Sequence, residues 1–192
     1  MTTVVSAIYC AAKEHGLIAG DSCFEKYHPD YYICSIADGL GSGEMAQQSA
    51  AVMPEILTKY SDESVCQLMA RCNEALKYKR GAAIAIAKVH YATQQVEYSS
   101  VGNVQMYMIN DADKLIYPIP QAGFLSGRKL HITSQNINYQ PNSRFFMHSD
   151  GIVVRRPAEL IKNHSSAQAM VNAVIPTIDF KDDATMIAIE IK

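Results

Sequence analysis

The sequence lacks several features that mark other classes of protein. It contains no tryptophan, only 8% aromatic residues, and no apolar run long enough to cross a membrane. Its formal net charge of −2 and pI near 6.3 do not give the basic surface that nucleic-acid binding needs. The first residues lack the basic stretch and apolar core of a signal peptide. We therefore expect a cytoplasmic protein that binds neither membranes nor nucleic acid.

Paired metal-binding cysteines are also missing. The five cysteines are odd in number, none forms a C-x-x-C pair, and the six histidines are scattered. A structural zinc site needs Cys and His at short spacings, so this pattern argues against zinc. We expect all five to be buried or half-buried thiols in a reducing cytosol: Cys10, Cys23, Cys34, Cys66 and Cys72.

Periodicity predicts strands and helices in separate blocks. Helices are expected at 44–59, where Pro54 would kink or split the pattern, and at 63–77, capped by Ser61 or Asp62. Shorter helices are expected at 157–163 and 166–175. Strands are expected at 4–12, 31–37, 81–91, 95–102, 104–110, 114–120, around 131–138, 144–149 and 184–191, with a turn at 111–113.

This order predicts an α+β protein with mostly antiparallel sheets and helices packed outside. Strict alternation of strand and helix is absent, so a doubly wound parallel sheet is disfavoured. The 192 residues suit one domain, 1–192, and we find no repeat or linker-like stretch. The polar segment 121–140 reads as a mobile flap around one strand.

Acidic residues recur at the ends of the predicted strands. Asp38 follows an apolar strand in ADGLGSG, Asp150 ends another in HSDG, and Asp182 and Asp183 precede the last strand in KDDAT. Asp21 lies in GDS, before a segment that could itself be a strand. Taken singly, each motif also fits an ordinary turn, because Asp-Gly is a common turn dipeptide. As a set, they can meet at one rim of a sheet.

Carboxylates gathered at one rim repel each other, and cations relieve that repulsion. Oxygen ligands without His or Cys favour Mg²⁺, Mn²⁺ or Ca²⁺ over zinc. Two such cations sharing a hydroxide can attack a phosphorus atom. His148 is a tempting general acid, but we interpret it as a strand histidine facing the sheet or solvent, and Arg155-Arg156 as a solvated pair.

The ordered motifs resemble the PPM family of metal-dependent Ser/Thr protein phosphatases, also called the protein phosphatase 2C family. The resemblance spans Gly20 to Ile189, in GDS (20–22), ADGLGSG (37–43), RGAAIAI (80–86), SVGNVQMYMI (100–109), HSDGI (148–152) and KDDATMIAI (181–189). It implies a four-layer αββα sandwich: two mainly antiparallel sheets flanked by two pairs of helices, without a regulatory domain.

The resemblance also implies a ligand set for two divalent cations, Mn²⁺ or Mg²⁺. Asp38 would bridge both metals and the Gly39 carbonyl would bind the second. Asp150 and Asp182 would bind the first metal, and Asp21 would hold a water beside them. Asp183 stands where many relatives have Asn and receives a supporting role.

Two positions depart from the family pattern. No Arg occurs in residues 1–12, where many larger relatives hold the substrate phosphate with one. Asn103 stands where many bacterial relatives have a metal-binding Asp, so a third metal is not expected.

The short chain most resembles stressosome phosphatases, through ARCNEAL (70–76), KRGA (79–82), YPIP (117–120) and LSGR (125–128). This implies phosphorylated scaffold proteins of the RsbS and RsbR type as partners, and a feedback reset of the stress response. Two alternatives stay open: a PPM phosphatase for another phosphoprotein, such as an anti-sigma-factor antagonist, and a non-catalytic pseudophosphatase.

Overall fold

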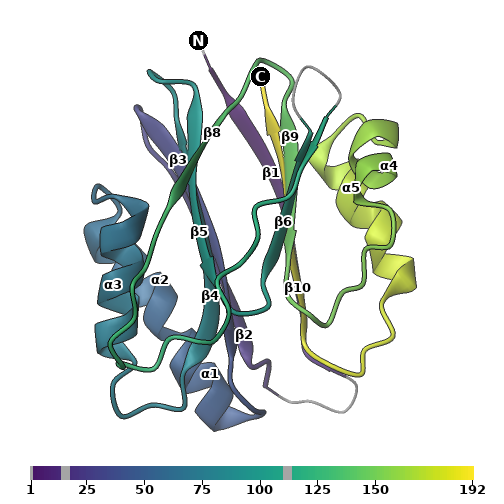
Figure 1. Ribbon diagram of the computed structural model, residues 1–192. Coiled ribbons are helices and arrows are strands. Elements are labelled where there is room, and N and C mark those ends of the chain that lie inside the picture. The colour runs from purple at the N-terminus through teal and green to yellow at the C-terminus, as the bar shows by residue number, and fades with distance from the viewer. Residues whose placement is uncertain (1, 14–17, 110–113) are drawn as a thin grey trace.

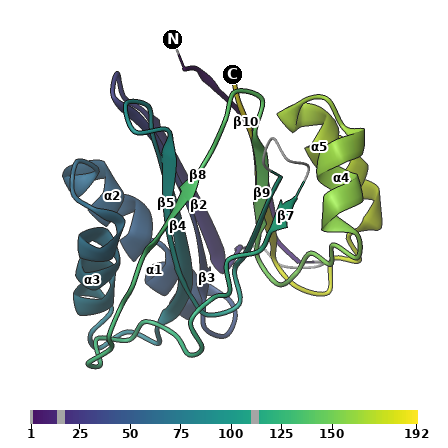
Figure 2. The ribbon, with the colours of Figure 1, turned by 45° about the horizontal axis from the view of Figure 1, so that its top comes forward.

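The computed structural model describes residues 2–13, 18–109 and 114–192. Within these residues two five-stranded antiparallel sheets pack face to face, with helices over both outer faces (Figure 1). Figure 2 shows the four layers from a second direction. The predicted α+β, αββα sandwich is therefore confirmed. The predicted turn at 111–113 lies outside the described residues.

Each sheet mixes early and late parts of the chain. The first sheet has the order β1 (Val4–Ala11), β10 (Ala184–Ile191), β9 (Arg144–His148), β6 (Gln105–Ile109) and β7 (Leu115–Ile116). The second sheet has the order β2 (Asp21–Tyr27), β3 (Tyr31–Gly39), β4 (Ala82–His90), β5 (Gln95–Val101) and β8 (Gln135–Asn138). β1 and β2 are thus edge strands of different sheets.

Three apolar clusters hold the layers together. The central cluster lies between the sheets and contains Phe145 and Tyr98. A second joins the second sheet to α1 (Glu44–Ala50), α2 (Val52–Tyr60) and α3 (Val65–Ala75). A third joins the first sheet to α4 (Pro157–Asn163) and α5 (Ala167–Val174), which a short 3₁₀ turn, Ile175–Thr177, follows. Strands β3 and β4 are buried nearly throughout because both of their faces are covered.

The first helical layer differs in detail from the prediction. The expected helix 44–59 is split at Ala51, and Pro54 lies in the first turn of α2, where the missing N–H removes no helical hydrogen bond. This layer therefore holds three helices rather than a pair. The cap of α3 is Ser64, in a capping box with Gln67, and not Ser61 or Asp62.

The segment after β6 pairs less than expected. Only Leu115–Ile116 of the predicted strand 114–120 pairs with β6, since Pro118 and Pro120 have no N–H to offer a ladder. The segment predicted as a flap is fastened to the second sheet. Leu125 exchanges two backbone hydrogen bonds with Ala82, at 2.9 and 3.0 Å, and β8 pairs with β5.

The cysteine prediction needs one correction. All five cysteines are free thiols, but Cys10 is exposed rather than buried or half-buried, because it lies on the edge strand β1. Its sulfur lies 3.2 Å from that of Cys23 on β2. None of the helices in the described part of the chain has the length and apolar character needed to cross a membrane.

Candidate metal centre

The acidic residues gather at one end of the sandwich. Asp21 begins β2 and pairs in register with Asp38 near the end of β3. Asp150 follows β9, and Asp182 and Asp183 precede β10. These strand ends lie at the end of the sandwich where α1 begins, away from the two marked termini (Figure 1). We call this end the acidic rim.

Asn103 connects two of the carboxylates. Its amide nitrogen donates to Asp150 Oδ2 at 2.6 Å and to Asp38 Oδ2 at 3.2 Å. The residue lies in the short connection between β5 and β6, far in sequence from both partners. Asp38 and Asp150 therefore face one point, although they come from different sheets.

Asp21 is held in place by a buried serine. Ser149 donates its hydroxyl to Asp21 Oδ2 at 2.7 Å and accepts the backbone N–H of Thr185 at 3.0 Å. Because Ser149 is fully buried and bonded on both sides, it fixes the orientation of the Asp21 carboxylate. This contact links the second sheet to β9 and β10 of the first.

Asp183 holds the backbone that leads to the acidic rim. Its carboxylate accepts the backbone N–H of Lys13 at 2.9 Å and that of Gly20 at 2.7 Å, and the residue is only 5% exposed. These two donors lie on opposite sides of the connection from β1 to β2. The same side chain therefore fixes the backbone that leads to Asp21.

The glycines after Asp38 and Asp150 are required by close packing. A Cβ built on Gly39 would lie 2.0 Å from the carbonyl oxygen of Ala46 in α1. One built on Gly151 would lie 2.0 Å from the carbonyl oxygen of Asp183. The Asp-Gly pairs are therefore more than turn dipeptides, because only glycine allows these backbones to approach.

Burial and mutual repulsion disfavour ionisation at the rim. Burial, reinforced by the charges of Asp21 and Asp150, raises the pKa of Asp38 to about 7. Burial also raises the pKa of Asp21 to about 6, although hydrogen bonds from Ser149 and Thr185 oppose the shift. A bound cation would remove this cost, so the electrostatics favour a site for positive charge.

The carboxylates of the acidic rim are ligands that suit a hard cation. Their side chains are, however, too far apart in the structure to hold one metal ion together. In the described parts of the chain, no three His, Cys, Asp or Glu side chains are close enough to hold one metal as they stand. Asp182 Oδ1 accepts the N–H of Asp183 at 2.9 Å, and Asn103 lies between Asp38 and Asp150. All candidate side-chain ligands are carboxylates, which fits Mg²⁺ or Mn²⁺ and not zinc.

The sequence thus predicted that the carboxylates gather at one rim, but it did not reveal the residues that contact them. Asp21 pairs with Asp38 across two strands, Asn103 contacts both Asp38 and Asp150, and Asp182 lines a cavity with Asp150. The contacts of Asn103 and Ser149 were not predicted, although both residues lie in quoted motifs. His148 is buried in β9, where its ring stacks on Tyr107, as expected for a strand histidine.

Comparison with known proteins identifies the family of the chain. The family model described as stage II sporulation protein E (SpoIIE) matches residues 28–192. Among curated proteins, the phosphoserine phosphatase RsbX of Bacillus subtilis (strain 168) is 35% identical over 185 residues, covering 96% of this chain and 93% of RsbX.

Solved structures show the same fold. A crystal structure of RsbX in complex with magnesium superposes with a TM-score of 0.94 at 34% identity, covering 100% of both chains. The catalytic domain of the Ser/Thr protein phosphatase PstP with two manganese ions has a TM-score of 0.77 at 12% identity, covering 100% of this chain and 99% of the other. The second likeness concerns the fold alone. The chain therefore belongs to the SpoIIE family of PP2C-type protein phosphatases.

Proposed function

We propose that this protein is a metal-dependent phosphatase that removes phosphate from phosphoserine and phosphothreonine of stressosome scaffold proteins of the RsbS and RsbR type. It would thereby reset the general stress response in the cytoplasm. The observation that carries the proposal is the contact of Asp38 and Asp150 with one amide nitrogen of Asn103, with Asp21 paired opposite Asp38.

In the proposed site the carboxylates would hold two divalent cations, Mn²⁺ or Mg²⁺. Asp38 would be a ligand of both and the Gly39 carbonyl a ligand of the second, whereas Asp150 and Asp182 would hold the first. When bound, the cations supply a hydroxide nucleophile at neutral pH and Lewis acidity toward the phosphoryl oxygens. Asp21 would hold water beside them. Ser149 orients Asp21, and Asp183 fixes the backbone before it.

The choice of substrate is supported by similarity. RsbX is named a phosphoserine phosphatase and matches this chain along nearly its full length. The stretches ARCNEAL, KRGA, YPIP and LSGR support a stressosome partner. Another phosphoprotein, such as an anti-sigma-factor antagonist, would require the same chemistry, so a panel of phosphorylated candidates should be ranked by kcat/KM.

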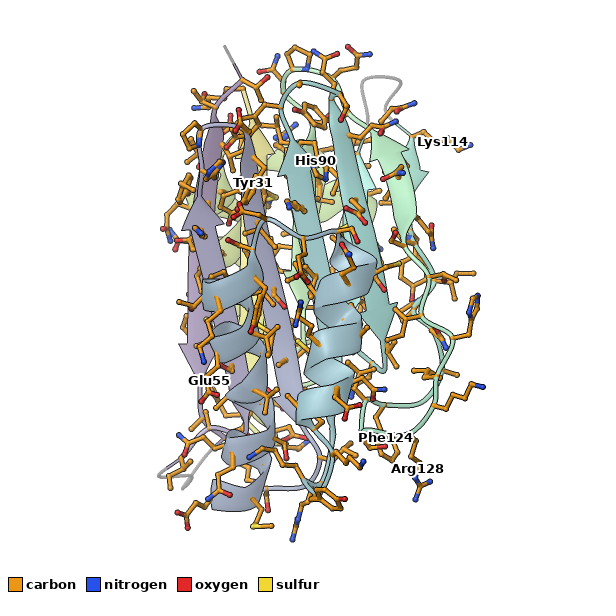
Figure 3. The ribbon with its side chains drawn as sticks, turned by 90° about the vertical axis from the view of Figure 1, so that its left-hand side faces the viewer. Tyr31, Glu55, His90, Lys114, Phe124 and Arg128 are labelled. Atoms are coloured by element: carbon orange, nitrogen blue, oxygen red, sulfur yellow. The ribbon has the colours of Figure 1, made fainter. Side chains whose placement is uncertain are left out.

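Phosphate release from a phosphorylated scaffold protein tests the activity. We expect turnover to require Mn²⁺ or Mg²⁺ and to disappear with EDTA. Asp38→Asn and Asp150→Asn should each reduce turnover by more than about 100-fold, because even residues behind metal ligands contribute about 10–100-fold. Glu55→Gln is the matched control, since Glu55 lies exposed on α2 (Figure 3). Full turnover in both rim variants, at native unfolding temperature, would contradict the proposal.

A non-catalytic binding module is the second candidate. The observation that favours a binding module is the separation of the carboxylates in the structure. Among the described residues, no three possible ligands are close enough to hold a metal ion. Calorimetric titration with Mn²⁺ separates the two functions. A phosphatase should bind Mn²⁺ and lose that binding in Asp38→Asn, whereas a module without metal affinity should show no heat of binding.

A further inference from the structure

A cavity of about 590 Å³ lies beside the acidic rim. Asp150 and Asp182 border it on one side, and Val153, Thr177 and Arg155 lie among its other lining residues. Its volume falls in the range of sites that bind small ligands or parts of a larger one. The cavity therefore gives an incoming group access to the proposed metal ligands.

The three basic residues near this cavity differ in how they are paired. Lys181 lines the cavity but forms an ion pair with Asp179, with Nζ and Oδ2 3.0 Å apart. Arg156 forms an ion pair with Glu159 at 3.3 Å. Arg155 forms no ion pair with any residue in the ranges that the structure describes, and it lines the cavity. The two adjacent arginines thus have different surroundings.

An arginine in this cavity that forms no ion pair with the described residues is suited to bind an anion. Arginine offers five N–H donors in a planar fork that matches the oxygens of a phosphate or a carboxylate. The acidic rim repels a phosphorylated substrate until cations neutralise it, and a positive side chain in the adjoining cavity reduces that repulsion. Lys181 is already paired with Asp179. Arg155 is therefore the basic lining residue whose charge can interact with a bound anion.

We propose that Arg155 binds an oxyanion of the phosphorylated protein substrate in this cavity, and so positions the phosphoserine or phosphothreonine at the acidic rim. The inference rests on the proposed function. The oxyanion is either the phosphate itself or an acidic side chain next to it in the substrate, and three substrates distinguish these sources. Val153 and Thr177 also line the cavity, and the substrate residues next to the phosphorylated one would pack against them.

The test compares Arg155→Ala with Arg156→Ala in the Mn²⁺-loaded enzyme. The substrates are p-nitrophenyl phosphate, a phosphoserine peptide with neutral flanks, and the same peptide with Asp flanks. We expect Arg155→Ala to raise KM for the acidic phosphopeptide at least about tenfold, the effect of losing one charge-assisted hydrogen bond. Arg156→Ala should change KM less than about twofold, because its partner Glu159 is exposed. Arg155→Lys keeps the charge without the fork, and should restore part of the loss.

The pattern across substrates identifies the bound group. Equal losses with all three substrates place Arg155 on the phosphate, and a loss confined to the acidic peptide places it on a flanking carboxylate. If Arg155→Ala and Arg156→Ala behave alike on all three substrates, at native unfolding temperature, the proposal is overturned.

A binding measurement separates this proposal from the proposed function. Fluorescence anisotropy of a labelled phosphopeptide reports binding without turnover, with the unphosphorylated peptide as control. If the wild-type protein shows no turnover but Arg155→Ala still weakens phosphopeptide binding about tenfold, the catalytic function fails and the anion site stands. If turnover is normal and the variant binds as the wild type does, the anion site fails and the catalytic function stands.

Discussion

The two ends of the sandwich both enclose charged side chains, but in opposite ways. At the acidic rim, Asp38 and Asp21 are surrounded by other carboxylates, and their pKa values rise. At the opposite end, Lys88 donates to the carbonyl oxygens of Ser61 and Glu63 at 2.8 and 2.9 Å. Tyr31 and His90 mark that opposite end in Figure 3, and Phe124 lies toward the rim.

The opposite end satisfies each charge with a partner. Lys88 also lies over the ring of Tyr31, 4.1 Å from its centre. Glu97, its cross-strand neighbour, accepts the N–H of Val65 at 3.0 Å and the hydroxyl of Ser134 at 3.2 Å. These contacts stabilise the start of α3. We infer that charges at this end serve the fold, whereas charges at the rim serve a cation and cost stability without one.

Asp38→Asn should give the largest effect. It should lower the activity and, without metal, raise the stability. Turnover should fall by more than about 100-fold, because the variant lacks the carboxylate proposed to bind both cations. Without metal at pH 8, the unfolding temperature should rise, because the variant no longer buries a charge beside Asp21 and Asp150. A gain of 1 kcal/mol corresponds to about 2–4 °C in a protein of this size. Differential scanning fluorimetry in EDTA measures this, and a lower unfolding temperature would contradict the comparison.

Lys88→Met should lower the stability of the protein and leave its activity nearly unchanged. Two carbonyl oxygens lose their donor, so the free energy of unfolding should fall by about 1–3 kcal/mol while kcat stays within about twofold. Urea denaturation and steady-state kinetics provide the two measurements. Lys59→Met, at an exposed site on α2, is the control and should leave stability nearly unchanged. Equal stability of the two variants would show that Lys88 is not a structural charge.

Ser149→Ala should weaken the rim without removing a proposed ligand. The Asp21 carboxylate loses a hydrogen bond of 2.7 Å, so Mn²⁺ affinity should fall by about 10–100-fold in calorimetric titration. Ser35→Ala is the control, since Ser35 is equally buried but donates to Ala85 in the middle of the sheet. Unchanged Mn²⁺ affinity in Ser149→Ala would show that the orientation of Asp21 does not matter for binding.

The smallest effect should be the pH dependence of stability in the metal-free protein. Asp38 and Asp21 have folded pKa values near 7 and 6, above the ordinary value of 3.8. Their contribution to stability is therefore complete below about pH 4 and is lost as pH rises through 6 and 7. The unfolding temperature in EDTA should fall between pH 5 and pH 8, and saturating Mn²⁺ should flatten that slope.

The variant Asp38→Asn isolates this contribution from other groups. His148 is buried with a lowered pKa, so its own effect on stability runs the other way, increasing as pH rises toward its unfolded value. The slope in EDTA should be shallower in Asp38→Asn than in the wild type. An identical slope would assign the pH dependence to groups other than the rim carboxylates.

Local sequence patterns predicted most of the helices and strands. The predictions were wrong where contacts between residues far apart in the sequence determine the structure. The helix at 157–163 and the strand at 184–191 agree with the structure to the residue, since Pro157 and a β-branched apolar run mark them. Ser61 is as good a helix cap as Ser64 by residue type. In the structure, however, its hydroxyl accepts hydrogen bonds from Lys26 and Tyr31 instead.

The gathering of the carboxylates at one rim was predictable from the sequence, but the residues that contact them were not. Strand-end carboxylates are visible in sequence because Asp recurs beside Gly at the ends of apolar runs. The contact of Asn103 with Asp38 and Asp150 depends on how the two sheets face each other, which no local pattern records. The exposure of Cys10 likewise follows from strand order rather than from composition.

The position of β10 has a consequence for how the protein is made. It follows every other described strand along the chain, yet it lies between β1 and β9 in its sheet. Asp182 and Asp183 precede it, and the Asp183 carboxylate holds Lys13 and Gly20, over 160 residues earlier. During synthesis, Lys13 and Gly20 can therefore form these contacts only after Asp183 has left the ribosome. A nascent chain that lacks β10 also lacks these two contacts, so the acidic rim assembles only after the last strand has been made.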